Sequence, residues 1–344
     1  MIPIDALSWD GSRRSRQSVC QIDIPYSALD LSKVTPRSGF LKLVLLTLLA
    51  VLLTGCTNSK LIIGPLYNRL DNQMQSEFDK FGDFNETQNN AFKQAIGTFH
   101  VWHRQVEMPK YADLLQEIAA SISTSGSTER NDVARWATNI EKYSRNVREC
   151  HPGNYLFDLI QSLTDTQINF IEKRFNSERQ KNRERNGTQT REERVERRLK
   201  NIVKWAGRLG LDFSTAQRNI IQDGLIQQVS LRKEYYQLSN EWNTNLFVLA
   251  RNQDNRAYDK DLKNHITKLW TLLEVAHPEE WHSIRNLWRN TVYTLIGTFS
   301  KEQRDSTSQW LKKMEKTVRA ISKDTPSFNI SNDPDVGCLT IAEN

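Results

Sequence analysis

The sequence predicts an all-α protein, and three observations carry that prediction. Glycine and proline are sparse, at 14 and 9 of 344 residues. Long segments place apolar residues at intervals of three and four, and no segment keeps the two-residue period of a strand for long. Four segments also share one helix-start signature. We therefore expect a multi-helix bundle or an array of helical hairpins, with about eight to ten helices over residues 65–324.

Each helix-start signature is a capping residue followed three positions later by glutamine, with Phe or Leu directly before the cap. The cap side chain accepts a bond from the third backbone amide, and the glutamine reaches back to the amide of the cap. The caps and their glutamines are Asn85 and Gln88, Thr164 and Gln167, Ser214 and Gln217, and Ser300 and Gln303. Their spacings are irregular, so they indicate helix boundaries without indicating an internal repeat.

Apolar stripes predict how far these helices run. The helix that starts at Asn85 carries such a stripe to Pro109, where the chain must bend or restart. From Ser214 one long helix is expected to reach Arg251, and a further helix is expected over 261–276.

An apolar run at residues 43–53 ends in Leu53-Thr54-Gly55-Cys56. The run is too short to span a membrane, which takes about 20 apolar residues, but it fits the apolar core of a signal peptide with basic residues before it. The tetrapeptide is similar to the lipobox of bacterial lipoproteins, in which signal peptidase cleaves before the cysteine and the cysteine thiolate takes the diacylglycerol. We therefore expect cleavage between Gly55 and Cys56 and lipidation of Cys56.

Residues 1–36 precede a signal that should begin near its own initiator. Either the leader is unusually long, or translation starts at a codon decoded here as Val34; we favour the second interpretation. Residues 1–55 are therefore set apart from the fold as an upstream extension and a removed signal. Residues 56–64 form the anchor and a short linker, and the polar tail 325–344 is expected to be disordered.

The lipid anchor makes the membrane the first expected partner, since two acyl chains suffice for stable attachment. In enterobacterial lipoproteins, Asp directly after the lipidated cysteine favours retention in the inner membrane, and Thr57 stands there instead. We expect the protein in the inner leaflet of the outer membrane, with its helical domain facing the periplasm.

Two cysteines, Cys150 and Cys338, remain after the anchor. An exported protein meets an oxidising compartment, so a disulfide between them is one interpretation. Two unpaired cysteines are the other, because the sequence does not show whether their Cα atoms come within about 7 Å of each other.

Positive charge is concentrated in residues 172–208, which hold 13 Lys and Arg against 6 Glu. A solvated helix face with ion pairs between successive turns is one interpretation. A second is a site for an anionic envelope polymer or lipid headgroups. A third is an envelope protein partner, and a nucleic acid partner is not expected for an exported chain. The candidate polyanion contacts are Arg191, Arg194, Arg197, Arg198 and Lys204.

Chemistry-bearing patterns are scarce. His100, His103 and Glu107 could face one metal ion from successive turns, but His103 lies in an apolar stripe, so we expect a core histidine bonded to the backbone or to another helix. The sequence holds no Gly-rich phosphate loop, no nucleophile elbow and no zinc-protease motif. We expect no catalytic residue, metal or cofactor, and no enzymatic activity. Most tryptophans fall in apolar stripes, and Trp205 is the one expected to be exposed.

Three segments carry a resemblance to a known family. They are Tyr67-Asn68-Arg69-Leu70-Asp71, Trp102-His103-Arg104 and Glu107-Met108-Pro109-Lys110-Tyr111. Together with the lipobox, they resemble the proteobacterial lipoproteins grouped as domain of unknown function number 6279. This chain departs at Asn72, where an aromatic residue often follows the Asp, and at Met108, where the family has Leu. The resemblance implies an all-helical lipoprotein and supplies no activity, substrate or catalytic residue.

A second resemblance is confined to residues 163–167, Leu-Thr-Asp-Thr-Gln. The pattern is similar to one in small Spy-type periplasmic chaperones, although a capping box alone explains these letters. The expected function is therefore a lipid-anchored binding or scaffold protein of the cell envelope. The alternative is a chaperone-like binder of unfolded envelope proteins.

Overall fold

The computed structural model describes residue 67 and residues 70–123, 128–149, 159–187, 189–208, 210–253, 258–269 and 271–323. All of the described residues belong to one compact unit of the chain, Ile63–Asn344. Several predicted features lie outside the described residues: Gly55, Cys56, Cys150, Cys338 and the tail 325–344. The interpretations of these residues remain predictions.

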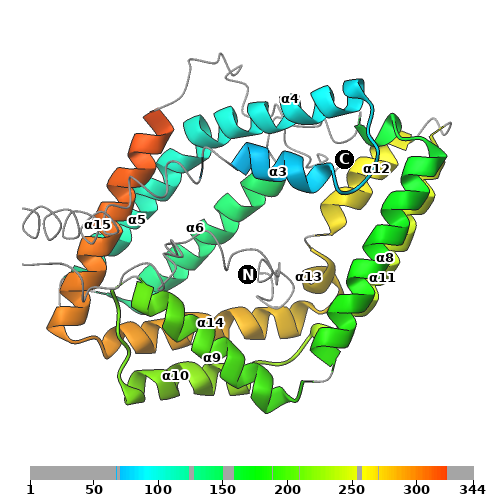
Figure 1. Ribbon diagram of the computed structural model, residues 1–344. Coiled ribbons are helices and arrows are strands. Elements are labelled where there is room, and N and C mark those ends of the chain that lie inside the picture. Colours follow the sequence, from blue (N-terminus) through cyan, green and yellow to red (C-terminus); the bar gives the residue numbers. More distant parts are fainter. Residues whose placement is uncertain are drawn as a thin grey trace, which may run out of the picture. The chain divides into compact units, whose positions relative to one another are not determined.

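The prediction of an all-α protein is confirmed. Across the described ranges the chain forms α-helices and one π-helical turn, without a strand among them (Figure 1). The first elements are α3 (Leu70–Phe78), α4 (Glu86–Trp102), the π-helical turn η5 (His103–Glu107), α5 (Met108–Ser123) and α6 (Arg130–Glu149). They are followed by α8 (Asp165–Gly187), α9 (Arg191–Arg208), α10 (Thr215–Gln227) and α11 (Arg232–Arg251). The last are α12 (Tyr258–Lys268), α13 (Leu272–Ala276), α14 (Pro278–Gly297) and α15 (Lys301–Lys323).

The single helix expected from Ser214 to Arg251 is wrong, because the chain leaves the helix after α10 and re-enters it at α11. Gln228 is extended, and its side-chain carbonyl accepts a bond from the indole N–H of Trp288 on α14 (3.0 Å). The Arg191 guanidinium donates to the backbone carbonyl of Ile226 (2.6 Å), which the end of α10 leaves without a helical partner. Contacts with α9 and α14 therefore stabilise a break that local helix propensity does not predict.

The helix expected over 261–276 is divided into α12 and α13. The division lets α12 pack on α11, where the Trp242 indole N–H donates to the His265 carbonyl (2.6 Å) and the two rings stack with centroids 5.1 Å apart. The short helix α13 packs instead against α11 and α14.

The bend expected near Pro109 takes the form of a wider helical turn. The chain remains helical from α4 through η5 into α5, and the Met108 amide donates to the carbonyl of His103, five residues back. Proline has no amide proton, and in an α-helix its ring would collide with the carbonyl four residues earlier. The π-helical turn directly before Pro109 lets the helix continue across the proline.

All four capping boxes are present, and they meet in pairs. In the first joint, between α4 and α8, the side-chain amides of Gln88 and Gln167 donate to each other (3.1 and 2.8 Å). Each amide also donates to the carbonyl two residues before the other helix's cap, Ser162 for Gln88 and Asp83 for Gln167, both at 2.8 Å. The joint thus ties together the N-termini of two helices that lie 79 residues apart in sequence.

The second joint, between α10 and α15, repeats this pattern. The amides of Gln217 and Gln303 donate to each other (2.8 and 2.9 Å) and to the carbonyls of Thr298 (3.1 Å) and Asp212 (2.7 Å), again two residues before each cap. The helix that follows α4 is α5, and it packs on α15. In the same way, the helix that follows α10 is α11, and it packs on α8 (Figure 1). The two joints are therefore equivalent in bonding and connection, although their spacings in sequence differ.

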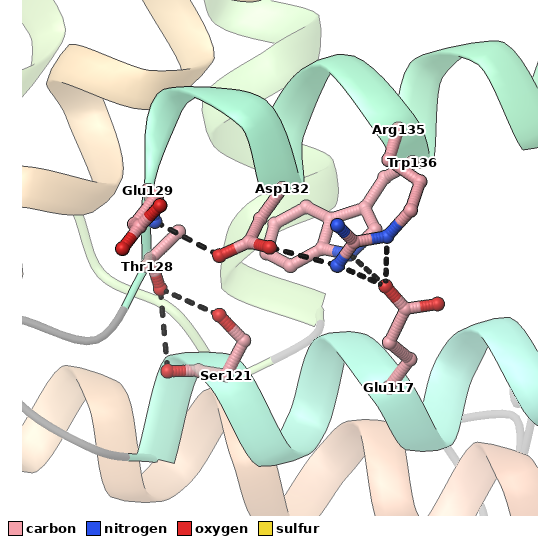
Figure 2. Close-up of polar contacts among 7 residues, drawn as sticks. All are labelled: Glu117, Ser121, Thr128, Glu129, Asp132, Arg135 and Trp136. Atoms are coloured by element: carbon pink, nitrogen blue, oxygen red, sulfur yellow. Dashed lines mark hydrogen bonds and ion pairs between the residues drawn. The ribbon is translucent and has the colours of Figure 1, made fainter.

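Helices α5, α6, α14 and α15 enclose the largest apolar cluster of the described residues, which includes Leu114, Trp136 and Leu311. Hydrogen bonds between α5 and the start of α6 fix this cluster's edge (Figure 2). The Glu117 carboxylate accepts from the guanidinium of Arg135 (2.7 Å) and from the indole of Trp136 (3.0 Å). The indole N–H is thereby paired, which lets the ring lie in the core.

Candidate functional site

An apolar pocket of about 340 Å³ lies where the loop before α4, the first turns of α8 and the last turns of α11 meet. Its lining side chains are all hydrocarbon: Phe78, Phe81, Phe84, Leu159, Ile160, Leu163, Ile168, Ile171, Phe175, Leu246, Phe247 and Ala250. Ligand pockets in proteins commonly span about 300–1,000 Å³, so this one suits a small or slender molecule. Because the lining offers no polar side chain, it can hold an alkyl or aromatic group but cannot activate a polar one.

Aromatic rings and the first joint shape the pocket. Phe78 stacks on Phe84 with centroids 3.9 Å apart, and Phe175 of α8 lies 5.5 Å from Phe81 and 6.0 Å, edge-on, from Phe247 of α11. The first joint holds the starts of α4 and α8 together beside these rings. Stacked rings and an anchored helix pair give the walls a fixed shape.

A second feature is a cluster around η5 into which the three family-like segments converge. The Nδ1 atom of His103 lies 2.7 Å from the hydroxyl of Tyr67, and its Nε2 atom lies 3.3 Å from the hydroxyl of Tyr111. A neutral imidazole has one N–H and one lone pair, so one tyrosine donates to the ring and the other accepts from it. The Arg104 guanidinium lies 5.0 Å from the centroid of the Tyr67 ring, and the Glu107 carboxylate, 1% exposed, pairs with Lys110 at 2.6 Å.

Burial, with the nearby charges of His100 and Arg104, lowers the pKa of His103 from 6.5 to about 4. Burial also raises the pKa of Tyr67 and of Tyr111. At neutral pH the three groups therefore form a neutral hydrogen-bonded chain, so His103 is bonded to other parts of the fold as expected, although its side chain is half-buried and not in the core. Such a chain holds its segments in register, and its donors and acceptors are used within the protein.

The low pKa of His103 predicts an acid-sensitive contribution to stability. The unfolded chain binds a proton on this side chain below pH 6.5 and the folded chain only below about pH 4, so the contribution is complete above 6.5 and is lost as the pH falls to 4. In the natural chain, protonation of His103 should lower the free energy of unfolding by up to about 3 kcal/mol between pH 7 and pH 4, and His103→Gln should not show this part of the decrease. Denaturant unfolding at both pH values measures it, with the exposed His282→Gln as control. Equal pH dependence in His103→Gln and the natural chain would contradict it.

A third feature is α9, which carries the five predicted polyanion contacts. Two of them are engaged by the backbone: Arg191 donates to the carbonyls at the end of α10, and Arg194 donates to the carbonyl of Gln189. Arg197 and Arg198 are half-buried, and Lys204 is exposed. The structure therefore gives Arg191 and Arg194 roles in fixing the start of α9, and it places Lys204 outward.

Two further α9 side chains define its outer face. The predicted exposure of Trp205 is confirmed at 59%. Lys200, absent from the predicted contacts, is exposed one helical turn before Lys204. A spacing of four residues would have pointed to it, since such residues share a helix face. We call Lys200, Lys204 and Trp205 the α9 outer face.

Among the described residues, none of the helices combines the length and the hydrophobicity that a membrane span requires. Nor do three or more His, Cys, Asp or Glu side chains gather there in a way that could hold a metal ion.

Comparison with known proteins assigns the family. Residues 80–274, more than half of the chain, match the model of the family of unknown function DUF6279. The chain belongs to DUF6279. No curated protein and no solved structure matches the chain.

The DUF6279 match contains nearly the whole pocket, from Phe81 to Ala250, and the η5 cluster apart from Tyr67. The pocket was not predicted, because its apolar side chains are indistinguishable in sequence from core residues. One signal was nevertheless present, since Phe78, Phe81 and Phe84 recur at three-residue spacing across a helix end and a loop. Aromatic residues that keep this spacing beyond the end of a helix indicate an apolar surface that something other than that helix covers.

Proposed function

We propose that this DUF6279 protein is a lipid-anchored lipoprotein of the cell envelope whose helical domain binds a hydrophobic ligand and catalyses no reaction. The observation that carries the proposal is the apolar pocket, whose lining can exclude water from an alkyl or aromatic group. The lipobox ending at Cys56 supports attachment to the inner leaflet of the outer membrane, facing the periplasm. Ligand capture at a membrane surface suits such a pocket, because apolar molecules concentrate there.

Hydrocarbon binding can be tested on the full lipidated chain in isolated membranes. The probe is hexadecanol with a mid-chain diazirine, added after synthesis so that it does not enter the anchor. We expect photolabelling of peptides from α8 and α11. Ala250→Phe, which extends a buried lining residue into the pocket, should lower this labelling about tenfold.

Val248→Phe is the matched control, since Val248 is 60% exposed on the same helix and should leave labelling unchanged. Thermal unfolding followed by circular dichroism checks that each variant folds, and Ile171→Phe, at a half-buried lining position, replaces Ala250→Phe if it does not. Labelling outside the pocket, or full labelling in a folded pocket-filling variant, would refute ligand binding here.

Chaperone-like binding of unfolded envelope proteins is the second candidate. The observation that favours it is an exposed Phe170 (51%) on α8, the helix that also supplies pocket residues, so an apolar client segment would meet ring surface both inside and outside the pocket. Light scattering from a denatured client separates the candidates. Suppression at near-stoichiometric ratios that Ala250→Phe abolishes favours the chaperone, and unchanged aggregation favours the small-ligand site.

The α9 outer face gives the proposed anchoring a testable orientation. Lysines attract anionic headgroups within about 8–10 Å, and indole rings favour the membrane interface. In vesicles that contain phosphatidylglycerol, we expect doxyl-labelled lipid to quench the Trp205 fluorescence, defined by difference from Trp205→Phe. Combined Lys200→Glu and Lys204→Glu should abolish this quenching, whereas Lys312→Glu with Lys316→Glu, an exposed pair of equal spacing on α15, should not. Quenching that persists in the α9 pair would contradict the orientation.

A further inference from the structure

The pocket's volume limits how much hydrocarbon it can take. About 340 Å³ lies near the lower limit for ligand sites, which favours one alkyl chain over the two chains of a phospholipid. Each methylene that leaves water for such a lining adds to the affinity. A single chain is therefore the hydrocarbon that this pocket fits.

The pocket also marks a difference between two equivalent helix contacts. At the α5–α15 contact, α15 lies along α5, and the buried Ser308 hydroxyl donates to the carbonyl of Ala119 (2.9 Å). At the α11–α8 contact the two backbones approach each other closely at fewer positions, and the pocket lies beside them. The α5–α15 contact shows that this connection of helices can pack closely, so the fold itself does not require a pocket at the α11–α8 contact.

An arginine stands at the edge of this lining. Arg174 is on α8 between the lining residues Ile171 and Phe175, and its guanidinium carbon lies 5.3 Å from the centroid of the Phe81 ring. Its Nε atom is buried with no hydrogen-bond partner, and within the described part of the chain no carboxylate pairs with this side chain. A cation held on a ring with an unused buried donor is available to an anion.

A second arginine beside the pocket, Arg251, is already paired within the protein. Arg251 on α11 pairs with Glu172 and also donates to Asn169 (2.7 Å) and to the carbonyl of Phe247 (3.1 Å). Its donors are engaged within the protein. The charge that can meet a ligand at the pocket is therefore that of Arg174.

We propose that the pocket binds a single-chain acidic lipid, a free fatty acid, with the alkyl chain among the phenylalanines and the carboxylate on Arg174. This inference rests on the proposed function and names the ligand of the same site. A guanidinium and a carboxylate match in shape and charge and can form two parallel hydrogen bonds. The hydrocarbon lining holds the chain, and Arg174 selects the acid over the uncharged alcohol.

The test compares two photoreactive probes in isolated membranes that contain the full lipidated chain. One is hexadecanoic acid with a mid-chain diazirine, and the other is the matching hexadecanol. We expect the acid to label pocket peptides about tenfold more strongly than the alcohol in the natural chain. Arg174→Gln should remove that preference and leave labelling by the alcohol intact, and Lys173→Gln, an exposed neighbour on α8, should keep the preference.

Each outcome decides a different point. Equal labelling by acid and alcohol in the natural chain, or a preference that survives Arg174→Gln, overturns the fatty acid and leaves hydrocarbon binding standing. Labelling by a diazirine phosphatidylglycerol that competes equally with the acid also overturns the single-chain ligand. Absence of pocket labelling by every probe removes the proposed function itself. Retained labelling by the alcohol shows that Arg174→Gln folds.

Discussion

Replacing Cys56 with alanine is expected to leave an unprocessed precursor that incorporates no labelled palmitate. The reason is chemical, since the diacylglycerol is joined through a thioether that only a cysteine thiolate can form, and cleavage before the cysteine follows that modification. Metabolic labelling with palmitate and the mobility of the protein on denaturing gels measure both steps. The effect is all-or-none.

A matched control is Ser59→Ala, which lies after the expected cleavage site and outside the lipobox. This variant should be labelled and processed as the natural chain is. Normal processing of Cys56→Ala would end the lipoprotein assignment. Sucrose-gradient fractionation of the natural chain tests the sorting expectation, and recovery with inner-membrane markers would overturn the outer membrane while leaving lipidation intact.

The second large effect is expected from a glutamine joint. Gln217 is 3% exposed. Its side chain accepts a hydrogen bond from the backbone N–H of Ser214 and donates to the backbone carbonyl of Thr298 and to the side-chain oxygen of Gln303. Gln217→Ala removes these bonds from the joint. We expect the free energy of unfolding to fall by about 3 kcal/mol, since each such bond contributes about 1 kcal/mol. Denaturant unfolding measures the change.

Two variants sharpen this result. Gln222→Ala, on the exposed side of the same helix, should change the free energy of unfolding by less than about 0.5 kcal/mol. Gln217→Glu keeps an acceptor for the Ser214 amide but, when ionised, donates to neither Thr298 nor Gln303, so it should be less stable at pH 7 than at pH 4. Equal stability of Gln217→Ala and Gln222→Ala would show that the joint does not hold α10 and α15 together.

Local signals in the sequence predicted local structure well. The caps at Asn85, Thr164, Ser214 and Ser300 all begin helices, because a capping box is complete within four residues. The pairing of the caps could not be predicted, since it depends on carbonyls about 80 residues away. The break at Gln228 was missed for the same reason, as Trp288 and its neighbours stabilise it from other helices.

The features of the candidate site were likewise predicted only where the signal is local. The exposure of Trp205 and the bonding of His103 to another part of the fold followed from their places on helix stripes, although His103 is half-buried and not in the core. The pocket did not, because a stripe shows that a side chain avoids water without showing whether protein or ligand covers it. Arg174 was one cation among many in a basic segment, and the absence of a carboxylate partner for it among the described residues becomes visible only once Phe81 and Arg251 are placed.

The packing of α5 on α15 sets the order in which the molecule can be completed during synthesis. The bond from Ser308 to Ala119 closes a separation of 189 residues. Until α15 has emerged, the face of α5 that carries Leu114 and Ile122 lacks the helix that covers it. Closing so long a loop is slow, and uncovered apolar faces aggregate. A chain that ends before residue 301 is therefore expected to aggregate more readily than the full chain.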